Sequence, residues 1–488
     1  MPRVRSFLVA GLALALAASF TAADTDNKVP DTPSYHRDVR PIFQQHCQGC
    51  HQPAKPMGGY VMTSHADLFK KGDREQPGII AGKPKESLLV EQITPKDGKF
   101  EMPKGKQDPL SARDLEIIRR WIEQGAKDDT PPAARQIVDA EHPPVYTRPP
   151  VLTSVVFSPD GSLLAVSGYH EVLLWKADGS ERIARLIGLS ERVQSIAFSP
   201  DGKRLAVAGG SPGRFGEIQV WDVEKKPARL KLSTSITYDT LYGVSWAPDG
   251  EKIAFGCSDN TVRAIDAESG KQVLFSNSHT DWVLGTVFSK DSRFVASVSR
   301  DGSVRLTELA TQRFIDNITS ITPGALKGGL QAIARNPVKS DAKVKPTEKG
   351  VDTSDRFYDE LLIAGADGTP KLYKMHREKK RVIGDDFNKI RVYPALIGRV
   401  NSVCFNGDGS QYVAGSSLDG EGEVVVCQTS DAKVLSKLEK QPGPVYSVAF
   451  HPEGKVVASG GFDGTLRLSD AATGKIIKEF VPVPLTQK

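Results

Sequence analysis

The chain of 488 residues has few long apolar runs. Its one extended run lies between Phe7 and Phe20, follows two arginines, and ends at the small residues Thr21-Ala22-Ala23. This run is too short for a comfortable transmembrane helix, whereas the basic start and small-residue end are typical of a secretory signal. We therefore expect residues 1–23 to be a cleaved signal peptide, and the protein to be exported, in a bacterium to the periplasm. An uncleaved anchor is the alternative.

The chain also lacks an excess of one charge and has little cysteine. A formal net charge of +5 is too small, in a chain this long, to indicate nucleic-acid binding. Of five cysteines, Cys257, Cys404 and Cys427 are scattered at spacings unlike those of metal ligands. We expect these three to be buried, reduced thiols, although an odd number also fits a disulfide plus a free thiol.

Motifs for hydrolysis or phosphate binding are missing from the larger, C-terminal part of the chain. After Val151 there is no serine-nucleophile motif, phosphate loop or metal-ligand cluster. His170 and His279 could face a ligand-binding surface, but we interpret both as structural or solvated. The sequence thus offers no catalytic constellation there.

The most informative motif is Cys47-Gln48-Gly49-Cys50-His51. Two thiols three positions apart can bond to the two vinyl groups of one porphyrin, and the following histidine then binds the iron. Half of a zinc site and a thioredoxin-like pair are the alternatives. A zinc site would need a second pair of ligands, which the sequence lacks. A thioredoxin-like pair requires a strand before the motif, whereas the preceding residues look helical. The motif therefore predicts one covalent haem c on Cys47, Cys50 and His51.

Two helical patterns bracket this motif. The first begins at Asp38, which we expect to cap it, and leads into Cys47. The second begins at a capping-box-like Ser111 and ends at Gly125. This arrangement predicts a small all-α domain in which the first and last helices cross and the haem fills the core.

A sulfur ligand is expected on the opposite side of the iron. Met102 precedes a turn-rich segment just before the last helix, so its thioether can be held facing His51. A histidine ligand or an open site is the alternative. We interpret the remaining candidates as core-filling or solvated; these are Met57, Met62, His46 and His65.

Residues 34–127 resemble the planctomycete-type monohaem cytochrome c domain. The likeness is carried by an ordered series of segments: residues 37–42, 47–51, 58–59, 82–89, 102–103 and 121–126. In that family the histidine of CxxCH and the methionine of a Met-Pro turn are the axial ligands. The resemblance implies the same roles for His51 and Met102. Lys104 stands where the family often has a second proline.

Residues 128–150 contain six prolines and predict a semi-rigid linker. From residue 151 to 484 the chain repeats an alternating strand that runs into a tight turn. The turns advance from Gly161 to Gly202, Gly250 and Ser292, and then from Gly409 to Gly454. A period of about 40–45 residues is typical of a four-stranded propeller blade. A degenerate repeat between Leu330 and Tyr373 brings the expected total to seven blades.

The repeats resemble WD40 over residues 151–480. Trp175 and Trp221 stand at the tryptophan position of the third strand, and His279 stands at the family's Gly-His position. Three repeats depart from the pattern at the tryptophan position, with Thr307, Cys427 and Ser469. We therefore expect several blades to lack the buried tetrad of hydrogen-bonded side chains.

Two functions from different classes fit these observations. The first is an electron-transfer protein, in which the haem carries one electron and the propeller docks a redox partner protein or an envelope protein complex. The second is a redox enzyme with a layout similar to cytochrome cd1, in which the propeller binds a substrate or second cofactor. The lack of a catalytic constellation and the count of seven blades favour the first.

Overall fold

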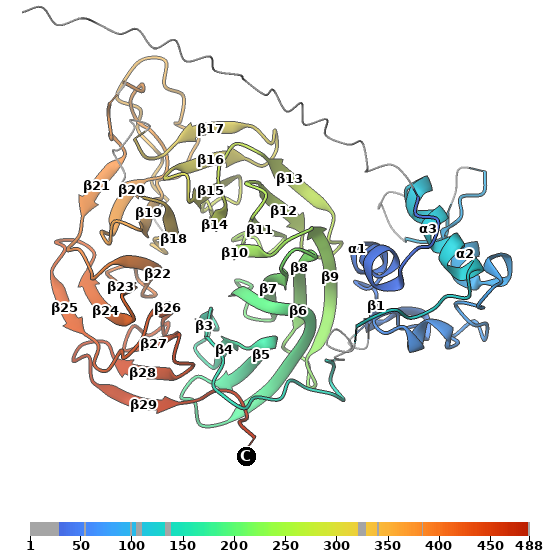
Figure 1. Ribbon diagram of the computed structural model, residues 1–488. Helices are drawn as coiled ribbons and strands as arrows, with labels where there is room; N and C mark the ends of the chain where they lie inside the picture. Colours follow the sequence, from blue (N-terminus) through green and yellow to red (C-terminus); the bar gives the residue numbers. More distant parts are fainter. Residues whose placement is uncertain are drawn as a thin grey trace, which may run out of the picture.

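A computed structural model describes residues 29–52, 55–97, 100–103, 110–131, 138–320, 328–338, 341–382 and 384–486. The expected signal peptide lies outside these residues. Figure 1 shows a compact helical region beside a ring of β-sheets. Within the described ranges, no helix is long and apolar enough to span a membrane.

The helical region begins one turn earlier than the sequence predicts. A π-helical turn η1 (Tyr35–Val39) continues into α1 (Arg40–His46). Ser34 is the cap: its hydroxyl accepts from the Arg37 amide at 3.0 Å, and the Asp38 carboxylate accepts from the Ser34 amide at 2.7 Å. Asp38 therefore completes a reciprocal cap from inside the helix instead of starting it, because the earlier serine takes the cap position.

Short elements connect α1 to the last helix. They are the strands β1 (His51–Gln52) and β2 (Lys55–Pro56), the 3₁₀ turns η2 (Met57–Gly59), η3 (Ala66–Phe69) and η4 (Pro84–Glu86), and α2 (Leu88–Ile93). The last helix, α3, spans Ala112–Glu123 and is capped by Ser111, whose hydroxyl accepts from the Asp114 amide at 3.0 Å. It ends at Gly125, which has a φ of 95°, so the predicted cap and stop are both present.

Trp121 joins the first and last helices. It is 2% exposed, and its ring stacks on Tyr35 with centroids 5.3 Å apart and meets Phe43 edge-on at 6.4 Å. Its indole nitrogen donates to the Lys127 carbonyl at 3.0 Å. One aromatic side chain thus anchors η1, α1 and the segment after α3 in a single core.

The remaining strands form antiparallel sheets, each with strands in chain order. One sheet has seven strands: β3 (Val155–Phe157), β4 (Leu163–Ser167), β5 (Tyr169–Lys176), β6 (Arg182–Phe198), β7 (Arg204–Ser211), β8 (Phe215–Asp222) and β9 (Arg229–Thr237). Three sheets of four follow: β10 (Leu241–Trp246), β11 (Lys252–Cys257), β12 (Val262–Asp266), β13 (Gln272–Ser276); β14 (Val283–Phe288), β15 (Phe294–Ser299), β16 (Val304–Glu308), β17 (Phe314–Asn317); β18 (Leu330–Arg335), β19 (Glu360–Gly365), β20 (Lys371–Lys374), β21 (Lys389–Val392). The last two are β22 (Arg399–Phe405), β23 (Gln411–Leu418), β24 (Glu421–Gln428), β25 (Val434–Lys437), and β26 (Val445–Phe450), β27 (Val456–Gly461), β28 (Leu466–Asp470), β29 (Ile476–Phe480).

The seven-stranded sheet arises because β6 is long. Its first part pairs with β5 from Arg182 to Ile187, and its second part pairs with β7 from Arg192 to Phe198. The degenerate repeat expected between Leu330 and Tyr373 forms the sheet β18–β21. The fold is therefore mostly β, as the repeats predict.

The repeated turns share one backbone conformation. The residue at each predicted turn position has φ between 59° and 75°, including Ser292, the only one that is not glycine. Its amide donates to the carbonyl three residues earlier, as in Gly161 to Ser158 at 2.9 Å. The recurrent glycine is thus explained by a left-handed position in the first hairpin of each repeat.

The ring closes by contacts between its first and last sheets, which share no strand among the described residues. The Leu152 amide donates to the Gly461 carbonyl at 2.9 Å, and the Val155 amide donates to the Ser447 hydroxyl at 2.9 Å. Beyond β29, Leu485 forms a parallel bridge with Tyr146. The segment before the repeats and the segment after them therefore meet at the closure.

Candidate haem site

The end of α1 places the two motif cysteines on one helical turn. The amides of Cys50 and His51 both donate to the Cys47 carbonyl at 3.1 Å. Both cysteines are free thiols, and Cys47 packs against the core that contains Trp121. Burial raises the pKa of Cys47 to about 12, so the thiol is neutral. The turn presents two thiols and one imidazole at the spacing that haem attachment requires.

A backbone contact fixes the orientation of His51. Its Nδ1 lies 3.1 Å from the Tyr60 carbonyl oxygen, which can only accept, so Nδ1 is the donor. Nε2 is then the nitrogen with a lone pair for a metal, which is the tautomer of an axial ligand. The Met62 amide also donates to the His51 carbonyl at 2.8 Å, so the segment 60–62 supports both ends of the residue. This donor set fits a haem iron.

Met102 lies on the same hydrophobic core as Cys47. It is half-buried, and its amide donates to the Gln92 carbonyl near the end of α2 at 3.0 Å. Its neighbours Lys104 to Pro109 lie outside the described residues. The structure thus places Met102 and the CxxCH turn around one core, and the ligand role of Met102 stays a prediction.

The other candidate ligands either pack inside the helical domain or are exposed to solvent. Met62 is 1% exposed in the core, whereas Met57 is 41% exposed. His65 contacts the Ala126 carbonyl through Nε2 at 2.7 Å and meets the rings of Tyr35 and Trp121. Burial lowers the pKa of His46, which keeps its imidazole neutral. Met62 and His65 are therefore core residues, as interpreted from the sequence, and Met57 fills no core.

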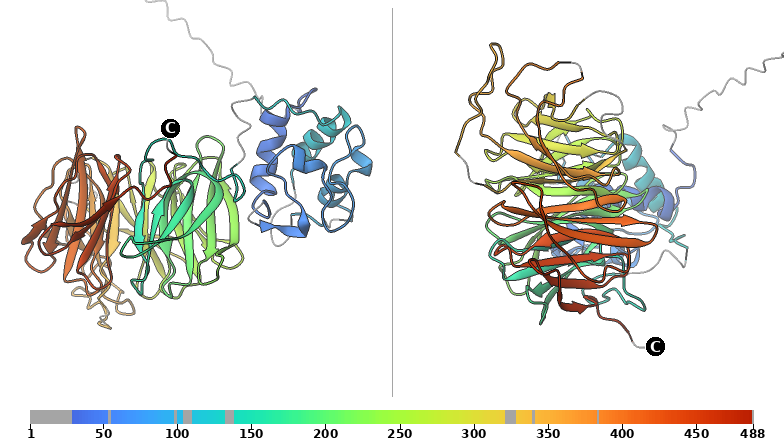
Figure 2. Two further views of the ribbon diagram at one scale, coloured as in Figure 1. Left: turned by 90° about the horizontal axis from the view of Figure 1, so that it is seen from below. Right: turned by 90° about the vertical axis from the view of Figure 1, so that its left-hand side faces the viewer.

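Sequence analysis missed the contact between the motif and the β-ring. A Cβ on Gly49 would lie 2.4 Å from the carbonyl oxygen of Ser233 in β9, and the Ser235 hydroxyl donates to the Gln44 carbonyl in α1 at 3.1 Å. The helical region lies beside β9 in Figure 1 and in the left view of Figure 2. The glycine between the two motif cysteines could have indicated a close contact at this position. It does not identify which part of the protein makes that contact.

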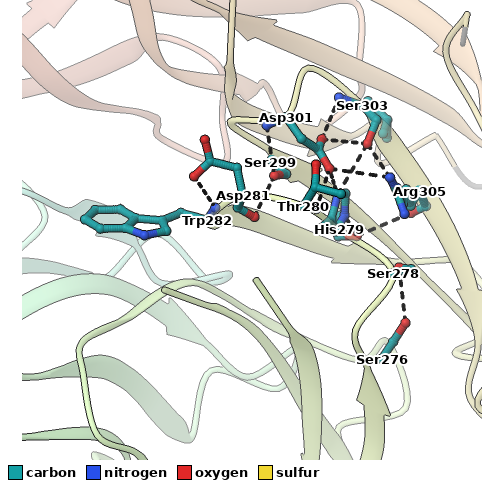
Figure 3. Close-up of polar contacts among 12 residues, drawn as sticks. Ser276, Ser278, His279, Thr280, Asp281, Trp282, Ser299, Asp301, Ser303 and Arg305 are labelled. Atoms are coloured by element: carbon teal, nitrogen blue, oxygen red, sulfur yellow. Dashed lines mark hydrogen bonds and ion pairs between the residues drawn. The ribbon is translucent and has the colours of Figure 1, made fainter. Parts of the chain in front are cut away.

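His279 belongs to a buried structural cluster (Figure 3). Its Nδ1 donates to Asp301 Oδ2 at 2.9 Å, and Nε2 lies 2.9 Å from the Ser297 hydroxyl. Thr307 takes the tryptophan position and is fully buried, and its hydroxyl has no hydrogen-bond partner among the described residues. The sheet β14–β17 therefore keeps three members of the expected tetrad, which are His279, Ser297 and Asp301. Its fourth member, the tryptophan, is replaced by Thr307.

Trp221 forms a different polar cluster, which the sequence analysis also missed. Its indole nitrogen donates to Gln219 at 2.9 Å, and Gln219 donates to Glu217 at 2.8 Å.

The scattered cysteines are all free thiols; Cys257 and Cys427 are buried, whereas Cys404 is half-buried. Burial raises the pKa of all three thiols. The prediction of reduced thiols is confirmed, and that of full burial holds for two.

The described geometry defines a class: a helical domain with a CxxCH turn joined to a ring of antiparallel β-sheets of four to seven strands. Comparison with known families agrees with both parts. Residues 47–105 match the family Planctomycete cytochrome C, residues 270–307 and 432–470 match the WD domain, G-beta repeat, and residues 214–286 match the Anaphase-promoting complex subunit 4 WD40 domain. The chain therefore joins a planctomycete-type cytochrome c domain to WD40 repeats.

Individual proteins are similar to this chain at low identity. They include nuclear distribution protein PAC1 of Komagataella phaffii, 24% identical over 52% of this chain and 44% of its own length. WD repeat-containing protein 26 homolog of Arabidopsis thaliana is 22% identical over 46% of this chain and 32% of its own. Serine-threonine kinase receptor-associated protein of Gallus gallus is 23% identical over 48% of this chain and 68% of its own. The chain thus spans less than half the length of the first two, and these likenesses concern WD-repeat proteins.

Proposed function

We propose that this chain is an exported c-type cytochrome that transfers single electrons through one covalent haem, with its β-ring acting as a docking scaffold. The observation that carries the proposal is the CxxCH turn, in which the Tyr60 carbonyl orients His51 through Nδ1. Cys47 and Cys50 would hold the haem by thioethers, and His51 and Met102 would bind its iron. A haem iron with two protein ligands supplies one-electron exchange with little rearrangement.

The residues of this chain prepare that site before any electron moves. Tyr60 and Met62 hold the backbone and ring of His51, and Gln48 donates from its side-chain amide to the Met62 carbonyl at 2.8 Å. Gln48 is 4% exposed, so this bracing lies away from water. Rigid support of a ligand keeps the coordination unchanged between oxidation states.

The β-ring is proposed to be a seven-bladed WD40-like propeller. β6 pairs on both sides, so it would serve as the outermost strand of the first blade and the innermost strand of the second. With β6 used twice, the seven-stranded sheet divides into two four-stranded blades, which join the five four-stranded sheets. We propose that this scaffold docks a redox partner protein or an envelope protein complex. Export is supported by the signal-like residues 1–23.

The test is the optical spectrum and mass of the protein isolated from a host that attaches haem c. The expected mass is that of residues 24–488 plus one haem, and the oxidised spectrum should show the weak sulfur-to-iron band of methionine ligation. Met102→Ala should lose this band, whereas the matched control Met57→Ala, at an exposed methionine, should keep it. A chain without haem, or with a second chromophore, would refute the proposal, and a band that survives Met102→Ala would refute the ligand assignment.

A further inference from the structure

A buried carboxylate on the strand next to β9 has no cationic partner among the residues that the structure describes. Glu217 in β8 is 1% exposed. It accepts hydrogen bonds from the hydroxyls of Ser190, at 2.6 Å, and of Ser233, and from the side-chain amide of Gln219 at 2.8 Å. All three donors are neutral. An ionised carboxylate in such a place is costly, because hydrogen bonds replace only part of its lost hydration.

The elements packed around Glu217 present mainly neutral groups to it. Across the sheet it faces Gly209 of β7 and Ser235 of β9. Its side-chain hydrogen-bond partners in the described chain do not include the titratable side chains of the elements packed around it, which are Arg182, Arg185, Glu191 and Arg192 on β6, Arg204 on β7, Arg229 and Lys231 on β9, and Arg40 and His46 on α1. Burial raises the pKa of Glu217 above its ordinary value of 4.5, and the serine and glutamine hydrogen bonds only partly oppose this. This carboxyl group therefore binds a proton more readily than an exposed glutamate does.

The haem-attachment turn rests directly on the strand that bonds to Glu217. Ser233, a donor to the carboxylate, is the residue whose carbonyl abuts Gly49 between the two motif cysteines. Ser235, opposite Glu217 in the ladder, donates to the Gln44 carbonyl of α1. Only one strand, about 4.8 Å across, thus separates the carboxylate from the cytochrome domain.

A cavity connects the same two regions. It has a volume of about 260 Å³ and is lined by Gln52, adjacent to His51, and by Gly188 and Trp221 from the ring. Trp221 donates to Gln219, which donates to Glu217. The cavity therefore adjoins both Gln52, the residue after the motif, and the polar cluster that ends at the carboxylate, and it gives water a place beside that cluster.

We propose that Glu217 is a proton-accepting residue that sets the pH dependence of electron transfer in the cytochrome domain; this inference rests on the proposed function. When the domain accepts one electron from its donor protein, the Glu217 carboxylate takes up one proton from water. When the electron leaves to an acceptor protein, the carboxyl group returns the proton. One positive charge enters with each negative charge, so the buried region keeps its net charge. In a poorly screened interior this compensation acts across several ångströms.

The experiment measures the reduction midpoint potential of the full-length holoprotein against pH. Over the pH range in which the carboxyl group titrates, which lies above 4.5, the potential of the wild type should fall as pH rises, by up to about 59 mV for each tenfold change in proton concentration. Glu217→Gln keeps the size of the side chain and its ability to form hydrogen bonds, but it cannot ionise. We expect it to remove this slope. The control Glu224→Gln, at a side chain 60% exposed near the end of the same strand, should keep it.

An infrared readout separates proton uptake from a purely structural role. The reduced-minus-oxidised difference spectrum of the wild type should contain a new C=O band of a protonated carboxyl group, and Glu217→Gln should lack it. Equal slopes in the wild type and Glu217→Gln, or a carboxyl band that persists in the variant, would overturn the inference. The optical spectrum tests the proposed function separately: a chain without haem refutes both, whereas normal haem with equal slopes refutes only the role of Glu217.

Discussion

Gly49→Ala should release the cytochrome domain from the β-ring. The added Cβ would lie 2.4 Å from the Ser233 carbonyl oxygen, about 1 Å short of the 3.4 Å at which ordinary contact begins. The obstacle is backbone in a sheet, which yields less than a side chain does, and overpacking of this kind costs about 1–3 kcal/mol. The Ser235–Gln44 hydrogen bond at the same interface contributes about 0.5–1.5 kcal/mol. The free-energy cost of the clash is therefore at least comparable with the contribution of this hydrogen bond.

Small-angle scattering of the full chain measures this release directly. The variant should show a larger maximum dimension than the wild type, and hydrogen exchange should be faster at the outward amides of β9. Gly443→Ala is the matched control: it adds the same methyl group at a glycine of the β-ring whose φ is not in the left-handed region, where the nearest atoms lie at 3.9 Å, in ordinary contact. Scattering and exchange indistinguishable from the wild type would show that the contact with Ser233 does not hold the two parts together.

Three further changes test the β-ring. Thr307→Val removes a buried hydroxyl that has no partner in the described chain, so it should stabilise the protein by about 1 kcal/mol in urea unfolding; a loss of stability would contradict this. Tyr146→Phe removes the 2.7 Å hydrogen bond to buried Glu171 at the ring closure and should cost about 1–3 kcal/mol in the same assay, and an unchanged midpoint would show that this bond is dispensable. Burial opposes ionisation of Asp301, but the hydrogen bonds from His279 and Ser303 outweigh it and hold its pKa below 3.8. Its contribution to stability should be complete above 3.8 and lost as pH falls through the lower folded value, and Asp301→Asn should lack this acid-side loss.

Local sequence patterns predicted most of the helices and turns, because the residues that form each cap or turn lie close together in the sequence. The Ser111 cap and the Gly125 stop are satisfied by backbone groups within a few residues, and so are the glycine turns of the repeats. The same holds for the CxxCH turn, whose spacing follows from a single helical turn. The start of the first helix was predicted too late, because Ser34 and Asp38 cap it together and only Asp38 was considered.

The sequence by itself determined the spacing of the CxxCH motif and the repeat period, since both depend on neighbours in the chain. Only the tertiary structure decided what lies against the motif. Ser233 is far from Gly49 in sequence, and Tyr60 contributes a backbone carbonyl that any residue would carry. Ring closure through Tyr146 and Leu485 likewise joins opposite ends of the repeats. Contacts of this kind leave no local pattern, because each depends on where the whole fold brings two distant segments together.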